Sequence, residues 1–373
     1  MTSRERLLGA IRLQPIDRVP INTYELCGFN SNSFENRQES YRELMDFIRA
    51  HTDTATMWNP SGNGSLGMSA YPTEVETAIE RSGRFRVFSR RAKTPSGRIL
   101  TATDRVYDDV FTTWHTEHWC KDLDDVDAYL SIPFVPVQYD FSDYARVREE
   151  TGDHGIIMAS VGDPACTAME IMEFGEATVW ALSEPEHYAE TMDELHRRNM
   201  INLENMLKAG VVDLYRICGP EYLTPPYLPP RYFERFVAPY VADMTVLIHR
   251  YGGLVRVHSH GKIQKVLDMI LSCGADAIDP CEAPPDGDIT LKEVKARVGD
   301  RMCIFGNLQL KLLENGTEDA VRSAVKLCMD SAKGSTGYVI MPTASPINVP
   351  LNKNTERNYR AFIETALELG RYE

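Results

Sequence analysis

Residues 254–281, LVRVHSHGKIQKVLDMILSCGADAIDPC, contain the pattern that decides the fold. The apolar run Leu254–His260 predicts a buried strand, the apolar spacing over Lys262–Cys273 predicts a helix, and Ala275–Asp279 predicts a second strand. Gly274 stands where the C-cap of that helix is expected. Strand, helix and strand in this order predict a βαβ unit with parallel strands.

The same unit recurs along the chain. Apolar runs predict further strands at Val19–Leu26, Thr54–Trp58, Ile156–Val161, Val212–Cys218, Met302–Phe305 and Tyr338–Met341. Further helical patterns lie at Glu39–His51, Glu184–Ala209, Arg231–Tyr251, Thr290–Val298, Glu318–Lys333 and Asn354–Leu369. This alternation predicts an α/β fold, a (β/α)8 TIM barrel, that occupies residues 1–373 as a single domain. A doubly wound sheet is the alternative, but no glycine-rich fingerprint follows the first strand.

One segment does not fit a plain barrel. A long stretch separates the second and third predicted strands, and within it Val75–Thr116 alternates Thr, Arg, Val, Phe and Tyr. Pro95-Ser96-Gly97 has the composition of a hairpin turn. We therefore predict a β-hairpin insertion between strands 2 and 3, within residues 75–120, that covers the barrel mouth.

The composition is that of a globular protein and excludes several partners. Of the 373 residues, 54 are acidic and 40 basic, which gives a net charge of −14 with histidine neutral. Binders of nucleic acid or anionic membranes need an excess of basic residues, so we expect neither partner. No window approaches the roughly 18 uncharged apolar residues of a membrane span. The 8 cysteines are too dilute for a disulfide scaffold and no secretory segment opens the chain, so we expect a reduced, cytoplasmic protein.

In a (β/α)8 barrel, functional groups lie where the strands end and the βα loops begin. His258 and His260, two residues apart on the fifth predicted strand, should point to the same face. Two neutral imidazoles form half of a zinc site, and Cys281 and Glu282, one βα unit later, are candidate ligands to complete it. The alternative is that one histidine binds substrate or backbone while the other is packed.

The third and fourth strand ends carry candidate catalytic side chains. Asp163 follows the third strand and is a candidate base, although an Asp before a proline is also a common turn former. Glu221 and Tyr222 follow the fourth strand and precede a proline-rich loop. For Tyr222 the alternative is a role as an anchor of that loop.

Candidate substrate-binding residues stand at three other strand ends. They are Tyr24 after the first strand, Asn59 after the second and Asn307 after the seventh. For Asn307, which follows a glycine, a capping role is the alternative. His115 and His118 lie in the inserted segment among charged neighbours, and we interpret them as surface residues.

Four segments carry a family resemblance. They are SRERLLGAIRLQPIDRVPI (3–21), VHSHGKIQKVLDMILSCGADAIDP (257–280), FGNLQ (305–309) and GYVIMPTASPINVP (337–350). In this order, and with the inserted segment between them, they resemble the uroporphyrinogen decarboxylase superfamily over essentially the whole chain. The resemblance implies a (β/α)8 barrel with its site at the C-terminal mouth.

True uroporphyrinogen decarboxylases differ from this chain at two places. They carry an arginine-rich segment after the first strand that grips propionates, where residues 23–34 read TYELCGFNSNSF without an arginine. They also carry a histidine turn after the last strand, where this chain has Thr343-Ala344-Ser345. A tetrapyrrole with many carboxylates needs basic clamps, so these differences argue against decarboxylation of uroporphyrinogen.

The chain is more similar to the other branch, the cobamide-dependent methyltransferases. That branch holds zinc with an HxC pair after strand five and a cysteine in the last βα turn. Here His258 keeps the first position, His260 replaces the cysteine of the pair, and Ala344 stands at the distal position. The resemblance implies transfer of a methyl group between a small methylated compound and a corrinoid protein, with zinc assistance and with Glu221 or Asp163 as a proton donor.

Three other functions stay open. A decarboxylase or lyase would use the barrel mouth without a metal. A metal-dependent hydrolase barrel also has an HxH pair, but on its first strand rather than its fifth. A ligand-binding descendant would have lost catalysis. A homodimer is one assembly compatible with the sequence, which does not specify the oligomeric state.

Overall fold

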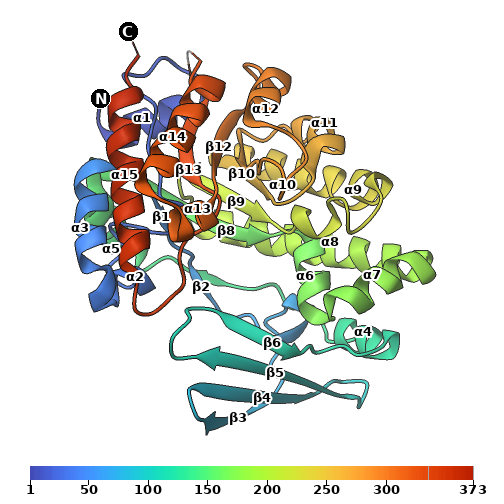
Figure 1. The fold of residues 1–373 in the computed structure, drawn as a ribbon. Helices are drawn as coiled ribbons and strands as arrows, with labels where there is room; N and C mark the ends of the chain where they lie inside the picture. Colours follow the sequence, from blue (N-terminus) through green and yellow to red (C-terminus); the bar gives the residue numbers. More distant parts are fainter. Residues whose placement is uncertain (335, 373) are drawn as a thin grey trace.

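The computed structural model describes residues 1–334 and 336–372. Within this range a seven-stranded parallel sheet curls into a half-barrel, with the order β1-β8-β9-β10-β11-β12-β13 (Figure 1). Its strands are β1 (Thr54–Met57), β8 (Gly155–Gly162), β9 (Leu214–Cys218), β10 (Leu254–Ser259), β11 (Ala277–Pro280), β12 (Cys303–Leu308) and β13 (Tyr338–Pro342). This α/β fold is consistent with a TIM-like barrel, and every strand predicted from Thr54 onward is present.

The predicted strand Val19–Leu26 is wrong. In the described part of the chain this segment forms a single parallel bridge, between Ile21 and Ile340, and no strand. The Asp53 N–H donates to the Ile21 carbonyl at 2.7 Å, and the Ile340 N–H donates to the Pro20 carbonyl at 3.0 Å. The segment therefore lies between β1 and β13 as a strand would, but Pro20 has no N–H with which to extend a ladder.

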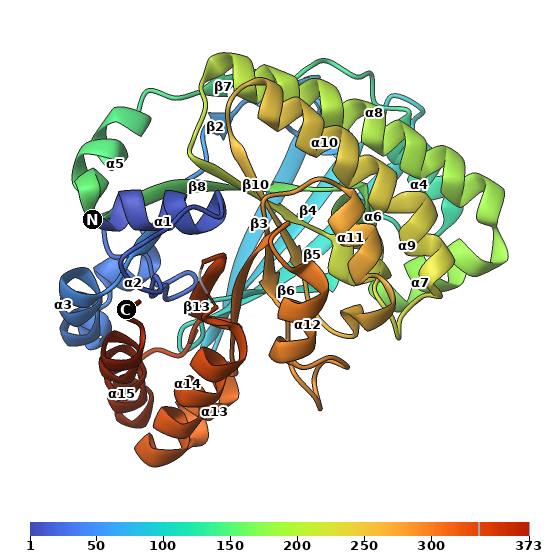
Figure 2. The same ribbon diagram turned by 90° about the horizontal axis from the view of Figure 1, so that it is seen from above.

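Helices pack around the outside of the sheet (Figure 2). They include α3 (Arg42–His51), α5 (Tyr144–Thr151), α8 (Pro185–Ala209), α10 (Ala238–Arg250), α11 (Leu267–Ser272), α12 (Leu291–Val298), α14 (Glu318–Ala332) and α15 (Lys353–Leu369). Further helices lie in the connections, namely α2 (Phe34–Arg37), α4 (Leu123–Leu130), α6 (Pro164–Ile171), α7 (Phe174–Ser183), α9 (Pro230–Phe236) and α13 (Leu310–Asn315). Across the described residues, no helix combines the length and the apolar character needed to cross a bilayer.

One predicted helix, Arg231–Tyr251, is divided into α9 and α10. The break falls at Val237, and Pro239 follows within the first turn of α10. A proline lacks the N–H that would continue the preceding helix, but it is accommodated in the first turn of a new one. The apolar spacing alone therefore predicted one helix where the backbone forms two.

Helix α1 (Ser3–Ile11) closes the end of the sheet at which the strands begin. Arg6 pairs with Asp53 at 2.7 Å, directly before β1, and Arg4 pairs with Asp213 at 2.7 Å, directly before β9. The apolar face of α1 packs on inward-facing strand side chains in a core cluster of its own. Because α1 fills this end, a ligand must approach from the opposite end, where the strands finish.

The segment between β1 and β8 differs from the predicted single hairpin. Among the described residues it forms a four-stranded antiparallel sheet, β3 (Val75–Ser82), β4 (Phe85–Lys93), β5 (Ile99–Tyr107) and β6 (Thr113–Glu117), here called the insertion sheet. Pro95-Ser96-Gly97 forms the turn between β4 and β5, where Gly97 has a φ of 91°. A turn at Gly83, with a φ of 60°, joins β3 to β4. The alternating pattern predicted strands here but not their number. The short strands β2 (Ser61–Gly62) and β7 (Tyr139–Asp140) pair with each other.

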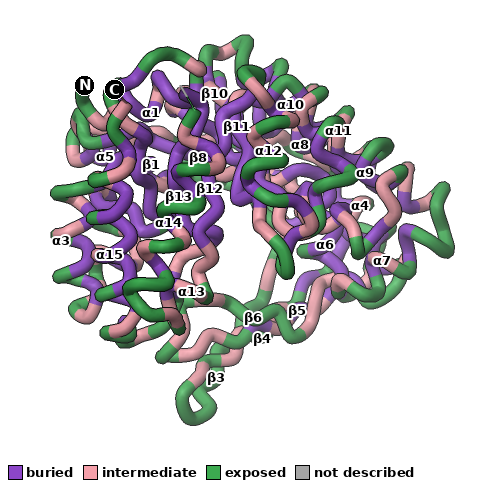
Figure 3. The backbone as a smooth tube through the Cα atoms, turned by 45° about the horizontal axis from the view of Figure 1, so that its top comes forward, coloured by how far each residue is buried: buried purple, intermediate pink, exposed green. Residues whose placement is uncertain are grey.

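The insertion sheet is attached to the loop that follows β13 and to the end of helix α6, which follows β8. At one end the Phe111 N–H donates to the Ile347 carbonyl at 2.7 Å, and the Phe111 ring stacks on Phe34 with centroids 3.7 Å apart. At the other end the Cys120 N–H donates to the Ile171 carbonyl at 2.7 Å. Both segments follow the carboxyl ends of barrel strands, so the insertion sheet lies on the mouth side. Figure 3 shows that the residues of the insertion sheet are mostly exposed or intermediate, whereas those of the barrel strands are mostly buried.

Candidate active site

The carboxyl ends of β9, β10 and β11 bring candidate polar groups together. In the parallel register, His258 of β10 lies opposite Asp279 of β11, and Arg256 lies opposite Arg216 of β9. The rings of His258 and His260 have centroids 4.5 Å apart and planes at 87°. The two-residue spacing of the histidines predicted this proximity.

Each histidine is fixed by a carboxylate at its Nδ1 atom. His258 Nδ1 lies 2.9 Å from Asp279 Oδ2, and His260 Nδ1 lies 3.2 Å from Glu282 Oε2. Burial lowers the pKa of His258 to about 3, so this imidazole is neutral at neutral pH. Burial also opposes protonation of His260, but the hydrogen bond and the charge of Glu282 outweigh it and raise the pKa. The two imidazoles therefore differ, because His260 gains a proton far more readily than His258.

Asp279 connects His258 to a buried arginine. Its second oxygen, Oδ1, forms an ion pair with Arg256 Nε at 3.0 Å, and the two side chains are 0% and 1% exposed. Burial alone would raise the pKa of Asp279, but the charge of Arg256 and the contact with His258 lower it overall. The guanidinium of Arg256 lies over the Phe305 ring, 4.9 Å from its centroid. The ionised Asp279 thus balances the charge of Arg256 and orients His258.

Glu221 faces the second ring nitrogen of His258. Glu221 Oε1 lies 4.0 Å from His258 Nε2, and Glu221 Oε2 accepts the Gly219 N–H at 2.9 Å. Burial raises the pKa of Glu221, which makes the carboxyl better suited to give a proton near neutral pH. Tyr222, the next residue, packs against Phe174 with ring centroids 6.1 Å apart. The catalytic role of Tyr222 stays a prediction.

Asp163 acts as a helix cap in this structure. It is fully buried, and its Oδ1 accepts the Cys166 N–H at 2.8 Å at the start of α6. A Cβ at Gly219 would lie 1.9 Å from Asp163 Oδ1, so the loop after β9 packs directly on this carboxyl. Burial raises the pKa of Asp163 well above its usual value. These contacts favour the turn-forming alternative, and the catalytic role of Asp163 stays a prediction.

The amides of Asn59 and Asn307 both bond to neighbouring parts of the chain. Asn59 Nδ2 donates to the Ser160 carbonyl at 2.6 Å, and Asn59 Oδ1 accepts the Ser160 N–H at 3.0 Å. Asn307 Nδ2 donates to the Cys281 carbonyl at 2.7 Å, and the Cys328 thiol donates to Asn307 Oδ1 at 3.6 Å. Both side chains therefore connect adjacent strands, and their substrate contacts stay predictions.

The predicted metal ligands are only partly assembled. His258 and His260 are adjacent, and a carboxylate on each Nδ1 leaves Nε2 as the atom that a metal would meet. Glu282 is the partner of His260, and Cys281 is fully buried with a thiol pKa raised by burial. Throughout residues 1–334 and 336–372, no three His, Cys, Asp or Glu side chains are grouped so as to hold a metal ion. We therefore derive no reaction step through zinc, which stays a prediction from the sequence.

Sequence reasoning missed two arginines inside the barrel. Arg216 and Arg256 interrupt the apolar strands β9 and β10 and are 4% and 1% exposed. Arg256 shares the parity of His258 and His260, so the i, i+2 rule would have placed it on the same face. A charged residue inside an apolar strand was the available signal. Tyr24 joins this group, because its hydroxyl accepts a hydrogen bond from Arg216 and its ring lies 6.3 Å from that of His258.

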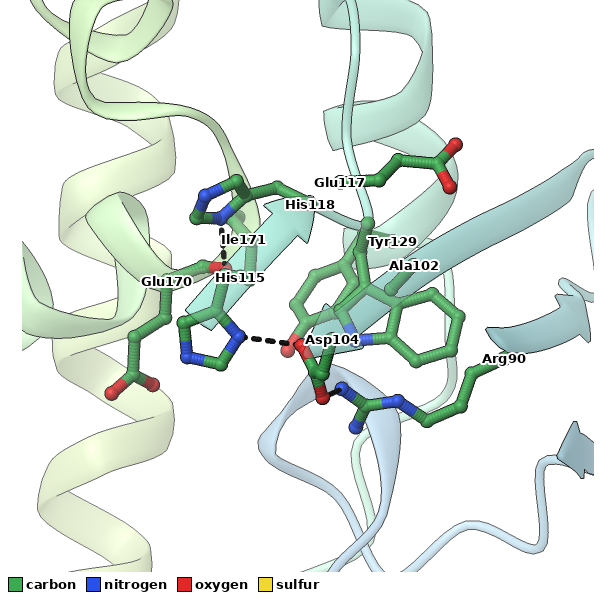
Figure 4. A pocket seen from close by; sticks show the side chains of 10 residues that line it. Arg90, Ala102, Asp104, His115, Glu117, His118, Tyr129, Glu170 and Ile171 are labelled. Carbon is green, nitrogen blue, oxygen red and sulfur yellow. Dashed lines mark hydrogen bonds and ion pairs between the residues drawn. The ribbon is translucent and has the colours of Figure 1, made fainter. Parts of the chain in front are cut away.

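A polar cavity of about 270 Å³ lies between the insertion sheet and α6 (Figure 4). His115 Nδ1 lies 2.7 Å from Asp104 Oδ1, and Arg90 pairs with the same carboxylate. The Glu170 carbonyl lies 2.9 Å from His118 Nδ1. His115 is 50% exposed, which agrees with its interpretation as a surface residue.

The fold and this site define an α/β protein of the TIM-like barrel class, with charged and titratable groups at the carboxyl ends of its strands. A family model described as uroporphyrinogen decarboxylase (URO-D) matches residues 115–368, and the chain belongs to this family. A uroporphyrinogen decarboxylase from Chromohalobacter salexigens is 23% identical over 359 residues, which cover 90% of each chain. A solved methyltransferase from Methanosarcina mazei has the same fold, with a TM-score of 0.61 and 16% identity over 99% of both chains. These likenesses confirm the family resemblance.

Proposed function

We propose that this chain is a methyltransferase or demethylase of the cobamide-dependent branch, which moves a methyl group between a small methylated compound and a corrinoid protein. The observation that carries the proposal is the group formed by neutral His258, fixed by Asp279, and Glu221, whose pKa is raised. This group stands at the strand ends where barrel enzymes do their chemistry. The fold of the protein named a methyltransferase in Methanosarcina mazei supports the same class.

The residues of the chain would bind and orient the donor and supply a proton. The bond that breaks joins the methyl carbon to an oxygen or nitrogen, and its electron pair stays on that heteroatom. Glu221 is placed to protonate the heteroatom, because burial raises the Glu221 pKa and keeps a proton on the carboxyl to higher pH. Asp279 holds the His258 ring by Nδ1, so that Nε2 faces Glu221. A corrinoid, held by a partner protein, would supply the acceptor for the methyl group.

The test is direct transfer to a corrinoid. The purified protein is incubated with a corrinoid protein reduced to the cob(I)alamin state and with a panel of methoxy-aromatic and methylamine donors. We expect the absorbance of methylcobalamin to appear with at least one donor and to be lost in Glu221→Gln. Absence of methylcobalamin across the whole panel would contradict the proposal.

Zinc assistance is a separate part of the proposal with its own test. Two histidines, each with a carboxylate at Nδ1, support it, because metal-bound histidines are commonly oriented in this way. We expect the purified protein to carry zinc in a fixed ratio, and both His258→Ala and His260→Ala to lose it. The matched control is His115→Ala in the insertion sheet, which should keep the metal. If wild-type protein purified from cells grown with added zinc contains no zinc, the zinc part of the proposal is refuted and the rest is unaffected.

A decarboxylase is the second candidate. The buried Arg216 favours it, because a guanidinium inside the barrel suits an acidic substrate. The name of the Chromohalobacter salexigens relative points to the same chemistry. Carboxylic acids incubated without any corrinoid separate the two candidates, because release of CO2 without methyl transfer would favour decarboxylation.

A further inference from the structure

Arg216 is a buried cation with an incomplete set of partners. Its side chain is 5% exposed and lies on β9 beside the histidine group. One terminal nitrogen donates to Glu25 Oε1 at 2.7 Å and the other to the Tyr24 hydroxyl. Among the described residues, the buried Nε of Arg216 has no hydrogen-bond partner. A guanidinium stays charged in proteins, so the barrel holds a positive charge whose Nε–H donor is unpaired.

The partner that balances Arg216 comes from the surface. The Glu25 side chain is 47% exposed, whereas the Arg216 side chain is 5% exposed. Glu25 belongs to the loop between α1 and α2, and its N–H donates to Ser345 Oγ at 3.0 Å in the loop after β13. An exposed carboxylate on a loop can move off the guanidinium without breaking a barrel strand.

The two buried arginines of this region differ in where their counter-charges lie. Asp279 Oδ1 lies 3.0 Å from Arg256 Nε, and both of these side chains are buried inside the barrel. Among the described residues, the carboxylate that pairs with Arg216 is that of Glu25. A buried guanidinium without a counter-charge is costly, so this position calls for another anion when Glu25 leaves it.

We propose that Arg216 binds a carboxylate of the substrate, and that Glu25 occupies that position in the structure described here. The Glu25 carboxylate at 2.7 Å already gives the geometry of a guanidinium–carboxylate contact. The Tyr24 ring lies 4.8 Å from the Arg216 guanidinium carbon and 6.3 Å from the His258 ring, so the tyrosine borders both the anion position and the histidines. The substrate class is a small methylated monocarboxylic acid, with its carboxylate at Arg216 and its methyl-bearing atom toward Glu221. This part of the inference rests on the proposed function, whereas carboxylate binding does not.

The test measures binding, without any corrinoid. Isothermal titration compares two carboxylate–amide pairs, acetate with acetamide and 4-methoxybenzoate with 4-methoxybenzamide. We expect the carboxylate of at least one pair to bind about tenfold or more tightly than its amide, because hydrogen bonds to a charged group are the stronger ones. Arg216→Gln should abolish this preference. Equal affinities within both pairs would overturn the proposal.

Glu25→Gln provides a second variant that leaves Arg216 in place. If Glu25 competes for the guanidinium, its neutral replacement should tighten carboxylate binding about threefold to tenfold and leave amide binding unchanged. The matched control is Glu190→Gln on the exposed face of α8, which should change neither. A purely structural ion pair would instead show lower stability in Glu25→Gln with no gain in carboxylate affinity, and that result would also overturn the proposal.

Carboxylate binding without methylcobalamin formation would keep this proposal and reject the methyltransferase function. Methyl transfer from neutral donors only would keep the methyltransferase function and reject carboxylate binding at Arg216.

Discussion

The same three residue types meet at two places in this molecule, and the two places behave differently. In the barrel, Asp279 joins His258 and Arg256. In the insertion sheet, Asp104 joins His115 and Arg90 (Figure 4).

Solvent exposure separates the two groups. The His258 and Arg256 side chains are 5% and 1% exposed, whereas those of His115 and Arg90 are 50% and 31% exposed. In the barrel, burial lowers the pKa of His258, and the contact with Asp279 only partly opposes this fall. In the insertion sheet, water screens the charges. The two groups share their residue types and differ in burial, and for this reason we assign the proposed function to the buried group at the strand ends.

The largest expected difference between the two groups is in stability. Asp279→Asn leaves buried Arg256 without its counter-charge, and we expect it to lower the free energy of unfolding by about 3–5 kcal/mol. Asp104→Asn removes the matching contact in the insertion sheet, where we expect a loss of about 1 kcal/mol or less. Urea unfolding of both variants measures the two values. Equal losses would remove the distinction drawn here between the groups.

The second expected difference is in catalysis. Glu221→Gln keeps the shape of the side chain but removes its acidic proton, so we expect kcat to fall about 100- to 10,000-fold. In the wild type, kcat should decline as pH rises through the raised pKa of Glu221, because only the protonated carboxyl donates. The matched control is Glu170→Gln beside the insertion-sheet cavity, with little expected effect. A Glu221→Gln variant that retains wild-type kcat would rule out Glu221 as the proton donor.

The barrel strands could be predicted because each is buried on both faces and therefore reads as an apolar run. Val19–Leu26 also contains such a run, but whether it forms a ladder depends on partners far away in the sequence and on Pro20. In the insertion sheet the alternating pattern indicated strands, while the number of strands depended on a turn at Gly83 that carries only a weak signal.

The candidate site was predictable where local geometry alone decides it. The spacing of His258 and His260 predicted their shared face, because strand parity is a local property. The contacts of Asn59 and Asn307 join residues distant in the sequence, so their amides could not be assigned to backbone or substrate beforehand. Arg216 was not predicted, although a charged residue inside an apolar strand is unusual and was the available signal.

The smallest expected effect concerns the second histidine, and it depends on pH. The pKa of His260 is raised above 6.5 in the folded protein, so its stabilising contribution is complete below that value and is lost as pH rises through the folded-state pKa. The pKa of Glu282 is lowered below 4.5, so its contribution is present above that value and is lost as pH falls through the folded-state pKa. The pair therefore stabilises the fold most between pH 4.5 and 6.5. Because the His260 side chain is 35% exposed, we expect Glu282→Gln to cost about 1 kcal/mol or less there, and less still above the folded-state pKa of His260. Urea unfolding across this range, repeated with His260→Gln and with the double variant, isolates the pair. A coupling energy that does not change with pH would show that His260 does not hold a proton against Glu282.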